Sequence, residues 1–485
     1  MGASQATDRC PGYSSCPAVY FPDVLAENAD ALAVRRANAI EKRNALLRFD
    51  EARPGAERKA LLGAILVHDE TLSVEKNQAC ASCHASYAGF SGPVALINKK
   101  TAANPGSVAM RAGLRKPMSL AYATYAPVLA YNNAASAFVG GNFWDMRATG
   151  LVTGSASADQ AQAPFTSPFE MAMPDPACVV YRVARGAYRA KFEEVWGGNA
   201  FAVRWPAGTA TACARPNSSA DADPRALVLA AVDRKQAQAT FKNIALSIAA
   251  YEASSDASPF SSKFDAVQAG KAKFTPAERA GFALFTGGRA KCSNCHTAAG
   301  KPVLFTNFQA FNIGTPRNPD IPYLSENRPD GFGYVANSDG GAFVDLGLGG
   351  FLASSAVVNS AWKAQASFYK GAFRTPTLRN VDKRPRPAFA KSYAHNGYFP
   401  SLKALVHFYN TRGILDRCPD GLQRYGDTNG SKTVGYNCWP ASEIPATVNW
   451  QFTGRLGLSD LEESQIVAFL RTLSDGYDPS SEAGE

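Results

Sequence analysis

The chain has 485 residues, of which 46% are hydrophobic and 19% are charged, and its formal net charge is +9. This composition is ordinary for a globular protein, and the length suffices for two domains with separate cores. We find no apolar run long enough to span a membrane, and no run of Lys and Arg interleaved with aromatic residues of the kind that binds nucleic acid.

Helical patterns dominate the first half of the chain. Residues 23–50 and 56–67 carry apolar side chains at helical spacing among charged residues. Residues 89–168 are rich in Gly, Ala, Ser and Pro, which predicts loops and short helices. A proline-rich insertion is predicted at 174–224, followed by the clearest long helix of this half at 225–253.

The second half repeats this organisation after a predicted linker at 254–273. Thr275, Pro276 and Glu278 form a capping box that predicts the start of a helix. A Gly-rich stretch at 312–372 predicts another insertion of loops, and Ser459 caps a predicted terminal helix that ends near Leu473. There is little strand signal, so the expected fold is mainly α.

Each half carries the sequence C-x-x-C-H, at residues 80–84 and 292–296. Two thiols at this spacing form thioethers to the vinyl groups of haem, and the adjacent histidine becomes the proximal iron ligand. A single motif could also be a redox dithiol or part of a zinc site, but two in one chain predict two covalent c-type haems. The predicted attachment residues are Cys80, Cys83, Cys292 and Cys295, and the predicted iron ligands are His84 and His296.

The two motifs define two cytochrome-c-like haem domains with loop-rich insertions, predicted at residues 1–265 and 266–485. Covalent haem attachment in bacteria takes place outside the cytoplasm, so we expect a periplasmic protein whose signal peptide is absent from this sequence. The six remaining cysteines suit an oxidising compartment. Pairing between sequence neighbours is the simplest expectation, although the connectivity stays open and six reduced thiols are the alternative: Cys10, Cys16, Cys178, Cys213, Cys418 and Cys438.

The sixth ligand of the second haem can be narrowed down because candidate residues are scarce. The last methionine of the chain is Met173, so the second half contains none. His395, His407 and Tyr409 are the nearest alternatives, since tyrosine is a known haem ligand. Tyr409 belongs to an apolar helical stripe that starts after Ser401, which by itself favours a core tyrosine. His407 falls on another side of this helix and is expected to be exposed.

Several further motifs accompany the haem sequences in a specific order. They are FWDMRA at 143–148, QA at 160–161, PFTSPFEM at 164–171, GAFRTPTLRN at 371–380 and HNG at 395–397. With the two C-x-x-C-H halves, they resemble the bacterial dihaem cytochrome c peroxidase and MauG superfamily from about residue 56 to 473.

This resemblance implies roles for individual residues. The first haem would be the peroxide site, with Gln160, Pro164 and Glu170 beside it, and Trp144 would lie between the haems. Glu170 would move a proton during peroxide cleavage, although by residue type alone it would be a surface carboxylate. Tyr409 lies fourteen residues after His395, where MauG-like members have the distal ligand of the second haem.

The sequence departs from the family at two places. Lys100 stands sixteen residues after the first motif, where the peroxidases have a histidine that blocks the first haem, so we expect an open site. Ala390 and Ser392 replace the usual residues of a calcium site and no asparagine ligand is evident, so calcium matches poorly. His68 replaces a bulky aromatic residue and is expected to be an ordinary core or surface histidine.

We therefore predict a periplasmic dihaem c-type peroxidase of the MauG-like type. It would react with hydrogen peroxide at the first haem and store oxidising equivalents over both haems. Its electron donor would be a small redox protein or a protein substrate oxidised at a side chain. The alternatives are a conventional dihaem cytochrome c peroxidase reduced by a small cytochrome or copper protein, and a non-enzymatic dihaem electron carrier.

Overall fold

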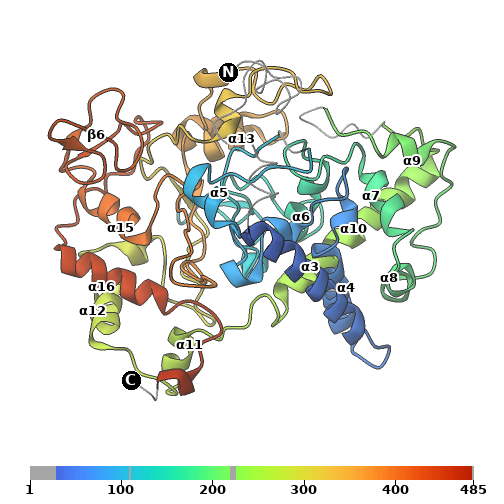
Figure 1. Cartoon of the computed structure of the whole chain (residues 1–485), viewed down its shortest axis with the longest axis horizontal. Helices are drawn as coiled ribbons and strands as arrows, with labels where there is room; N and C mark the ends of the chain where they lie inside the picture. The colour runs from blue at the N-terminus through green and yellow to red at the C-terminus, as the bar shows by residue number, and fades with distance from the viewer. Residues whose placement is uncertain (1–28, 109–110, 219–225, 483–485) are drawn as a thin grey trace.

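The computed structural model describes residues 29–108, 111–218 and 226–482, and it is mainly helical (Figure 1). The helices of the first half are α3 (Ala29–Arg48), α4 (Gly55–Val67), α5 (Ala95–Lys100), α6 (Ala156–Thr166), α7 (Pro176–Val183), α8 (Arg189–Trp196), α9 (Thr209–Ala212) and α10 (Ala231–Ala253). Those that follow are α11 (Lys263–Gln268), α12 (Pro276–Thr286), α13 (Gly347–Ala353), α14 (Ser360–Ala364), α15 (Leu402–Thr411) and α16 (Asp460–Arg471).

The strands are two or three residues long and form four separate pairs. The pairs are β1 (Ala130–Asn132) with β2 (Ala137–Val139), β3 (Ala310–Phe311) with β4 (Phe373–Arg374), β5 (Asp416–Arg417) with β8 (Cys438–Trp439), and β6 (Thr428–Asn429) with β7 (Lys432–Thr433). Only β5 and β8 are parallel. Because these pairs are so short, helices and loops carry the fold, which confirms the mainly α prediction.

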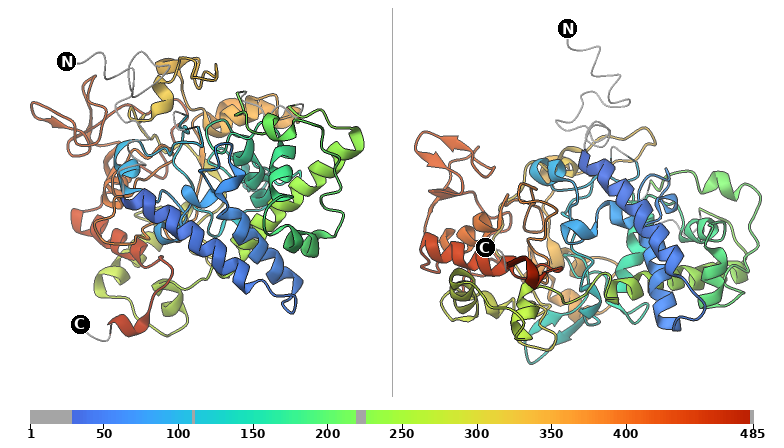
Figure 2. Two further views of the ribbon diagram at one scale, coloured as in Figure 1. Left: turned by 45° about the vertical axis from the view of Figure 1, so that its right-hand side comes forward. Right: turned by 60° about the horizontal axis from the view of Figure 1, so that its bottom comes forward.

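In each half, the helix before the haem motif crosses the last helix of that half at a glycine. A Cβ atom on Gly63 of α4 would lie 1.9 Å from the carbonyl oxygen of Ser247 in α10, and one on Gly281 of α12 would lie 1.9 Å from that of Gln465 in α16. Only glycine permits so close an approach of two helix backbones. The same kind of helix crossing therefore occurs once in each half. Figures 1 and 2 show α4 with α10 and α12 with α16 as two separate groups.

Two large apolar cores accompany these crossings. One contains buried residues from 45 to 257 and the other contains buried residues from 264 to 473. A smaller third cluster joins Phe138 and Met146 of the first half to Leu348 and Leu352 of α13. The predicted insertion at 312–372 is therefore packed against the first half through short helices, rather than projecting as a loop.

The structure refines several predicted elements. The helix predicted at 225–253 begins at Ala231, and Thr275 accepts a hydrogen bond from the backbone N–H of Glu278 at the start of α12, as the capping box predicts. The predicted linker at 254–273 contains the short helix α11, which begins after its own cap at Ser262 and buries Phe264. Besides the capping box and the buried Phe264, an ion pair of Asp265 with Arg379 holds this segment.

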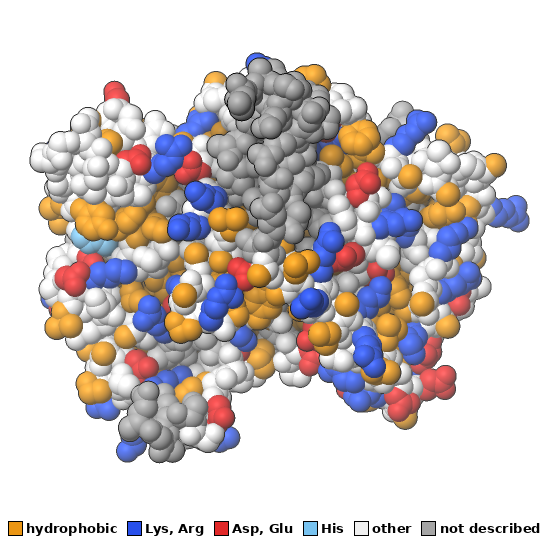
Figure 3. Space-filling view, in the orientation of Figure 1, with side chains coloured by type: hydrophobic (Ala, Val, Ile, Leu, Met, Phe, Trp, Pro, Cys, Tyr) orange, Lys and Arg blue, Asp and Glu red, His pale blue; other side chains and the backbone are white. Residues whose placement is uncertain are grey.

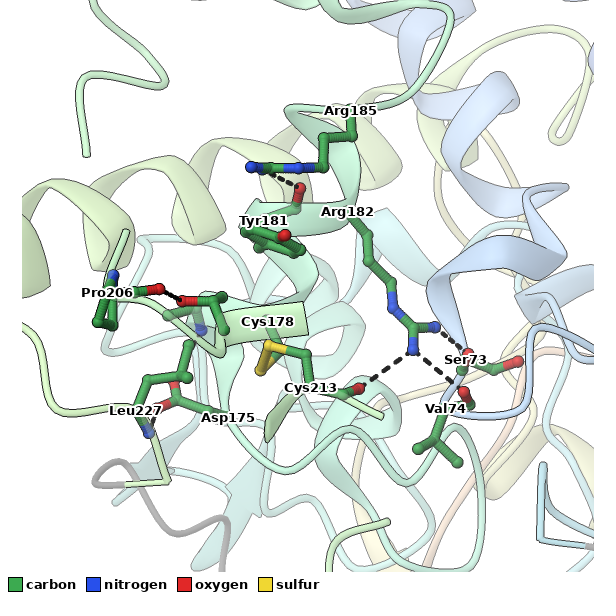
Figure 4. The surroundings of a disulfide bond; sticks show 12 residues. Ser73, Val74, Asp175, Cys178, Tyr181, Arg182, Arg185, Pro206, Cys213 and Leu227 are labelled. Atoms are coloured by element: carbon green, nitrogen blue, oxygen red, sulfur yellow. Dashed lines mark hydrogen bonds between the residues drawn. A yellow bond between two sulfur atoms is a disulfide. The ribbon is translucent and has the colours of Figure 1, made fainter. Parts of the chain in front are cut away.

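Two disulfides join sequence neighbours, Cys178 with Cys213 and Cys418 with Cys438, as expected. Cys10 and Cys16 lie outside the described residues. Figure 4 shows that Arg182, one turn beyond Cys178, donates hydrogen bonds to the carbonyl oxygens of Val74 at 3.0 Å and of Cys213 at 3.1 Å. The insertion at 174–224 is thus tied to the segment that leads into the first haem motif.

Candidate functional site

The two C-x-x-C-H motifs have the same local structure. Each begins with a 3₁₀ turn, Cys80–Ser82 in the first half and Cys292–Asn294 in the second. The Nδ1 atom of His84 lies 3.0 Å from the carbonyl oxygen of Phe90, and that of His296 lies 2.9 Å from the carbonyl oxygen of Phe305. A bond of this kind fixes the tautomer that leaves Nε2 free for a metal.

The loops that hold these histidines are also equivalent. Phe90 and Phe305 both adopt left-handed backbone angles, with φ of 57° and 52°. The carbonyl oxygen of the residue before each phenylalanine accepts a hydrogen bond from a hydroxyl group, that of Ser119 at 2.9 Å in the first half and that of Thr377 at 2.6 Å in the second. The halves therefore repeat the support of the histidine as well as the helix crossing.

The first motif opens into a cavity of about 390 Å³. Cys83, His84, Gln160 and Glu170 line it, and a small adjoining cavity is lined by the same four residues together with Cys80 and Pro164. Gln160 and Pro164 come from α6, and Glu170 comes from the turn that follows it. The residues assigned to the peroxide site by resemblance thus lie together around the first motif.

The second motif opens into a cavity of about 220 Å³. Tyr409 lines it together with Leu402, Leu405 and Val406, so the stripe predicted on this helix faces the cavity. His407 is not among the lining residues; its Nδ1 atom lies 2.9 Å from an oxygen of Glu463. The expectation that His407 is exposed is wrong, because this contact leaves it half-buried.

Both cavities fit a c-type haem. The four motif cysteines are the only cysteines without a disulfide bond among the described residues. Burial raises the pKa of Cys80, Cys83 and Cys292 to about 12, which favours the thiol over the thiolate form. The first cavity with its small neighbour, and the second cavity by itself, thus each offer two thiols and one imidazole, which is the donor set that thioether attachment and axial ligation require.

Trp144 lies where the two cavities meet, since its side chain lines both of them. Its indole Nε1 donates a hydrogen bond of 2.8 Å to the carbonyl oxygen of Lys116, and its own carbonyl oxygen accepts one of 2.7 Å from the backbone N–H of Arg374. Its ring also meets that of His395 edge-on, with centroids 6.3 Å apart. One residue from each half therefore holds this tryptophan in place.

Glu170 is held in the first cavity by its backbone. Its carbonyl oxygen accepts a hydrogen bond of 2.6 Å from Ser107, and its N–H donates one of 3.1 Å to the carbonyl of Ser167. Burial raises the pKa of the Glu170 carboxyl, and the positive charge of Arg147 opposes that shift. A raised pKa brings a carboxyl group closer to neutral pH, where it exchanges protons more readily.

The phenol of Tyr409, which lines the second cavity, is affected by burial in the same direction as the Glu170 carboxyl. Burial raises the pKa of its phenol well above the ordinary value, and the nearby guanidinium of Arg412 only partly opposes this. A phenolate at this position therefore needs a positive charge beside it, which a haem iron would supply.

The two remaining histidines, His68 and His395, are both buried among other protein groups. His68 is buried, with its Nδ1 atom 2.7 Å from the carbonyl oxygen of Ala64, as expected for a core histidine. His395 stacks on Phe373 with ring centroids 3.5 Å apart and lines the second cavity. Its Nε2 atom is buried without a hydrogen-bond partner among the described residues. Lys100 is exposed at the end of α5, outside both cavities.

Sequence reasoning missed a buried carboxyl group next to the first haem motif. Glu252 of α10 is fully buried and lines the small cavity beside Cys80. One of its oxygens accepts a hydrogen bond from Ser157 of α6, and the other has no partner among the described residues. Burial raises its pKa to about 8. Helical spacing had suggested only a core helix here, and no motif marked this residue.

An asparagine lies next to Ala390, at the position where the resemblance implies a calcium site. The side-chain amide of Asn98 donates a hydrogen bond of 2.9 Å to the carbonyl oxygen of Ala390, so an asparagine does lie next to this position. Its Oδ1 and the Oγ of Ser392 are both buried without a partner among the described residues. Sequence spacing had not identified Asn98. We assign no ion here.

Comparison with known proteins agrees with this arrangement. A family model described as di-haem cytochrome c peroxidase matches residues 57–273. The methylamine utilization protein MauG of Paracoccus denitrificans is 31% identical over 437 residues, which cover 89% of this chain and 92% of that protein. The cytochrome-c peroxidase IdrP1 of Denitromonas iodatirespirans is 30% identical over 171 residues, 34% of this chain and 40% of that protein.

Solved structures show the same relationship. The diheme peroxidase BthA of Burkholderia thailandensis superposes with a TM-score of 0.61 at 25% identity, over 86% of each chain. A MauG-like protein associated with microbial copper homeostasis shares the fold at a TM-score of 0.52 and 20% identity, over 86% of this chain and 90% of that one.

Proposed function

Because this chain belongs to the di-haem cytochrome c peroxidase family that includes MauG, and is a haem peroxidase, we propose that it reduces hydrogen peroxide at the first cavity. We further propose that the oxidising equivalents are shared over both haems, as in MauG-like enzymes. The observation that carries this proposal is the grouping of Gln160 and Glu170 around His84, in a cavity that meets the second one at Trp144.

The two haems supply the iron redox centres at which peroxide is reduced and between which electrons pass. The thiols of the two motifs would attach them, and His84 and His296 would be the proximal ligands. Tyr409 would be the distal ligand in the second cavity, where an anionic oxygen favours the oxidised state of iron.

Glu170 moves the proton that peroxide cleavage requires. Its carboxylate accepts a proton from one peroxide oxygen and returns it to the other, which leaves as water. Gln160 holds the peroxide or a water molecule by hydrogen bonds, and Pro164 shapes the wall of α6 beside it. The backbone bonds to Ser107 and Ser167 fix the main chain that carries this carboxylate.

Trp144 connects the two redox centres. Because this residue lines both cavities, with its indole bonded to Lys116 of the first half and its backbone carbonyl to Arg374 of the second, it offers an aromatic path between them. We propose that an electron travels through this ring when the second oxidising equivalent leaves the first cavity.

We place the protein in the periplasm with an external electron donor, either a small redox protein or a protein substrate oxidised at a side chain. The two disulfides support an oxidising compartment. No helix within residues 29–108, 111–218 and 226–482 is long and apolar enough to cross a membrane. Figure 3 shows basic and acidic side chains interspersed over one face, so charge alone does not mark a docking site on it.

The direct test is to add hydrogen peroxide to the fully ferric protein and follow its visible and EPR spectra. We expect one high-spin and one low-spin haem at rest, and spectral changes at both haems after peroxide is added. A need for prior reduction would instead favour the conventional peroxidase. Two low-spin haems that do not respond to peroxide would indicate an electron carrier.

A further inference from the structure

We propose that Lys116 and Arg374 form a cationic bridge that binds carboxylate groups of the haems where the two cavities meet. The inference rests on the proposed binding of two haems but is independent of their reaction with peroxide. Each c-type haem carries two propionate carboxylates, so the ligand chemistry is that of a buried carboxylate.

The two cations occupy equivalent positions in the two halves. Lys116 lies three residues before Ser119, and Arg374 lies three residues before Thr377. These two hydroxyl groups make the equivalent hydrogen bonds that support the loops of the proximal histidines. In both halves, a basic residue therefore stands three positions before the hydroxyl residue that supports the histidine loop, a lysine in the first half and an arginine in the second.

Both residues lie at the junction of the cavities. Lys116 and Arg374 each line the first and the second cavity, as Trp144 does. Their backbones also hold this tryptophan, Lys116 through its carbonyl oxygen and Arg374 through its N–H. An anion bound by either side chain would thus lie beside the proposed path between the two haems.

Neither cation has an acidic partner among the described residues. Arg374 is 6% exposed, its Nε has no hydrogen-bond partner and it forms no salt bridge. The Nζ of Lys116 donates only to neutral oxygens, the Oγ of Ser91 at 2.7 Å and the carbonyl oxygen of Pro117 at 3.5 Å. By contrast, the neighbouring Arg115 is paired with Asp145 and Asp345, each at 2.7 Å. A buried cation without a counterion is strongly unfavourable, so Arg374 calls for an anion, and the half-buried Lys116 offers a second positive charge at the same junction.

Lys391, a buried lysine at the second cavity, is different. The Nζ of Lys391 donates to the carbonyl oxygens of Ala88 at 2.8 Å and Lys383 at 3.0 Å, and this residue does not line the first cavity. Its donors are therefore largely used within the protein. A guanidinium such as that of Arg374 can instead bind a carboxylate through two parallel hydrogen bonds, which suits a propionate.

The test measures the reduction potential of each haem in the holoprotein by spectroelectrochemistry, in buffer without carboxylates. A nearby cation stabilises the reduced haem, which carries one positive charge fewer. We expect Arg374→Gln and Lys116→Gln each to lower the reduction potential of at least one haem by about 59 mV. For one electron, this shift corresponds to about a tenfold change in the equilibrium constant of reduction. Arg374→Lys and Lys116→Arg should restore most of the shift. Lys100→Gln, which removes an exposed charge outside both cavities, should change neither potential.

Unchanged potentials in both Gln variants with two haems bound would overturn the inference. If Arg374→Gln or Lys116→Gln fails to bind haem, the variant of the same residue that keeps the charge, Arg374→Lys or Lys116→Arg, should bind haem normally. Equal loss of haem in both variants of one residue would also overturn the inference. Potentials of the wild type that shift on addition of acetate would show that a free carboxylate, rather than a propionate, occupies the bridge, and would overturn the assignment to haem. If the potentials respond as expected but the protein does not react with peroxide, the cationic bridge would be supported and the proposed peroxidase function would be wrong.

Discussion

At the scale of single residues, Glu170 combines a fixed position with a raised pKa. We expect Glu170→Gln to keep the shape of the first cavity but to remove the proton transfer. Positioned acid–base groups contribute about 10²–10⁴-fold, so the reaction with peroxide should slow on that scale in stopped-flow measurements.

The control for Glu170 is Glu75→Gln, because Glu75 is exposed and does not line the first cavity. Its rate should match that of the wild type. A rate for Glu170→Gln within a few-fold of the wild type would remove this residue from the mechanism.

Tyr409 is the second residue on which the proposal depends. If its phenolate binds the second iron, Tyr409→Phe should leave that iron without its distal oxygen ligand and change the low-spin ferric EPR signal. His395, whose free Nε2 faces the same cavity, or water could then bind in its place. Tyr409→Met should raise the potential of this haem, because a neutral thioether stabilises ferric iron less than an anionic oxygen does.

Tyr398→Phe is the matched control, because this tyrosine is buried in the same half but does not line the cavity. Its EPR spectrum should equal that of the wild type. The same unchanged signal in Tyr409→Phe would mean that Tyr409 is only a core residue.

At the scale of elements, each half depends on one close helix crossing. Gly63→Ala would place a methyl group 1.9 Å from the carbonyl oxygen of Ser247, so α4 and α10 must move apart. Overpacking of this kind costs about 1–3 kcal/mol, and we expect a corresponding loss in urea denaturation. Because α4 leads into the first haem motif, the spectrum of the first haem should also change.

Gly55→Ala tests whether this loss comes from the crossing. Gly55 begins the same helix, and a Cβ atom there would meet nothing within 4 Å. Alanine is the better helix former, so this variant should be as stable as the wild type or slightly more stable. Equal destabilisation by both variants would contradict the role of the crossing.

At the scale of the whole molecule, Glu252 makes stability depend on pH. Its pKa is raised from 4.5 to about 8 in the folded protein, so the folded state binds more protons than the unfolded chain between these values. Stability should therefore fall as the pH rises through this window, by about 1.4 kcal/mol per pKa unit, and level off above it. Glu252→Gln cannot ionise and should flatten this dependence in thermal denaturation at about pH 5 and pH 8.

Two further variants complete this measurement. Glu326→Gln should flatten the curve in the same direction, because burial also raises the pKa of Glu326 to about 8. Glu51→Gln changes an exposed carboxylate and should leave the curve unchanged. A Glu252→Gln protein with the slope of the wild type would show that this carboxyl ionises freely in the folded state.

Much of this architecture could be predicted from local sequence. The capping boxes at Thr275 and Ser459 and the apolar spacing of α4, α10 and α15 are local signals, and the structure confirms these helices. The segment at 254–273 is predicted less well, because a cap, one buried aromatic residue and the distant Arg379 hold it without a long periodic pattern. The roles of Glu170 and Tyr409 came from resemblance, since residue type alone favoured a surface carboxylate and a core tyrosine.

The sequence by itself predicted the two haem attachment sites, since the C-x-x-C-H motif is contiguous and its chemistry requires only that spacing. Only the tertiary structure decided what surrounds them, because segments far apart in the chain meet there. Trp144 lies between Lys116 and Arg374, and Glu252 lies beside Cys80, across separations that no local pattern records. Burial, which raises the pKa of Glu252 and leaves Arg374 without a counterion, exists only after these segments have packed.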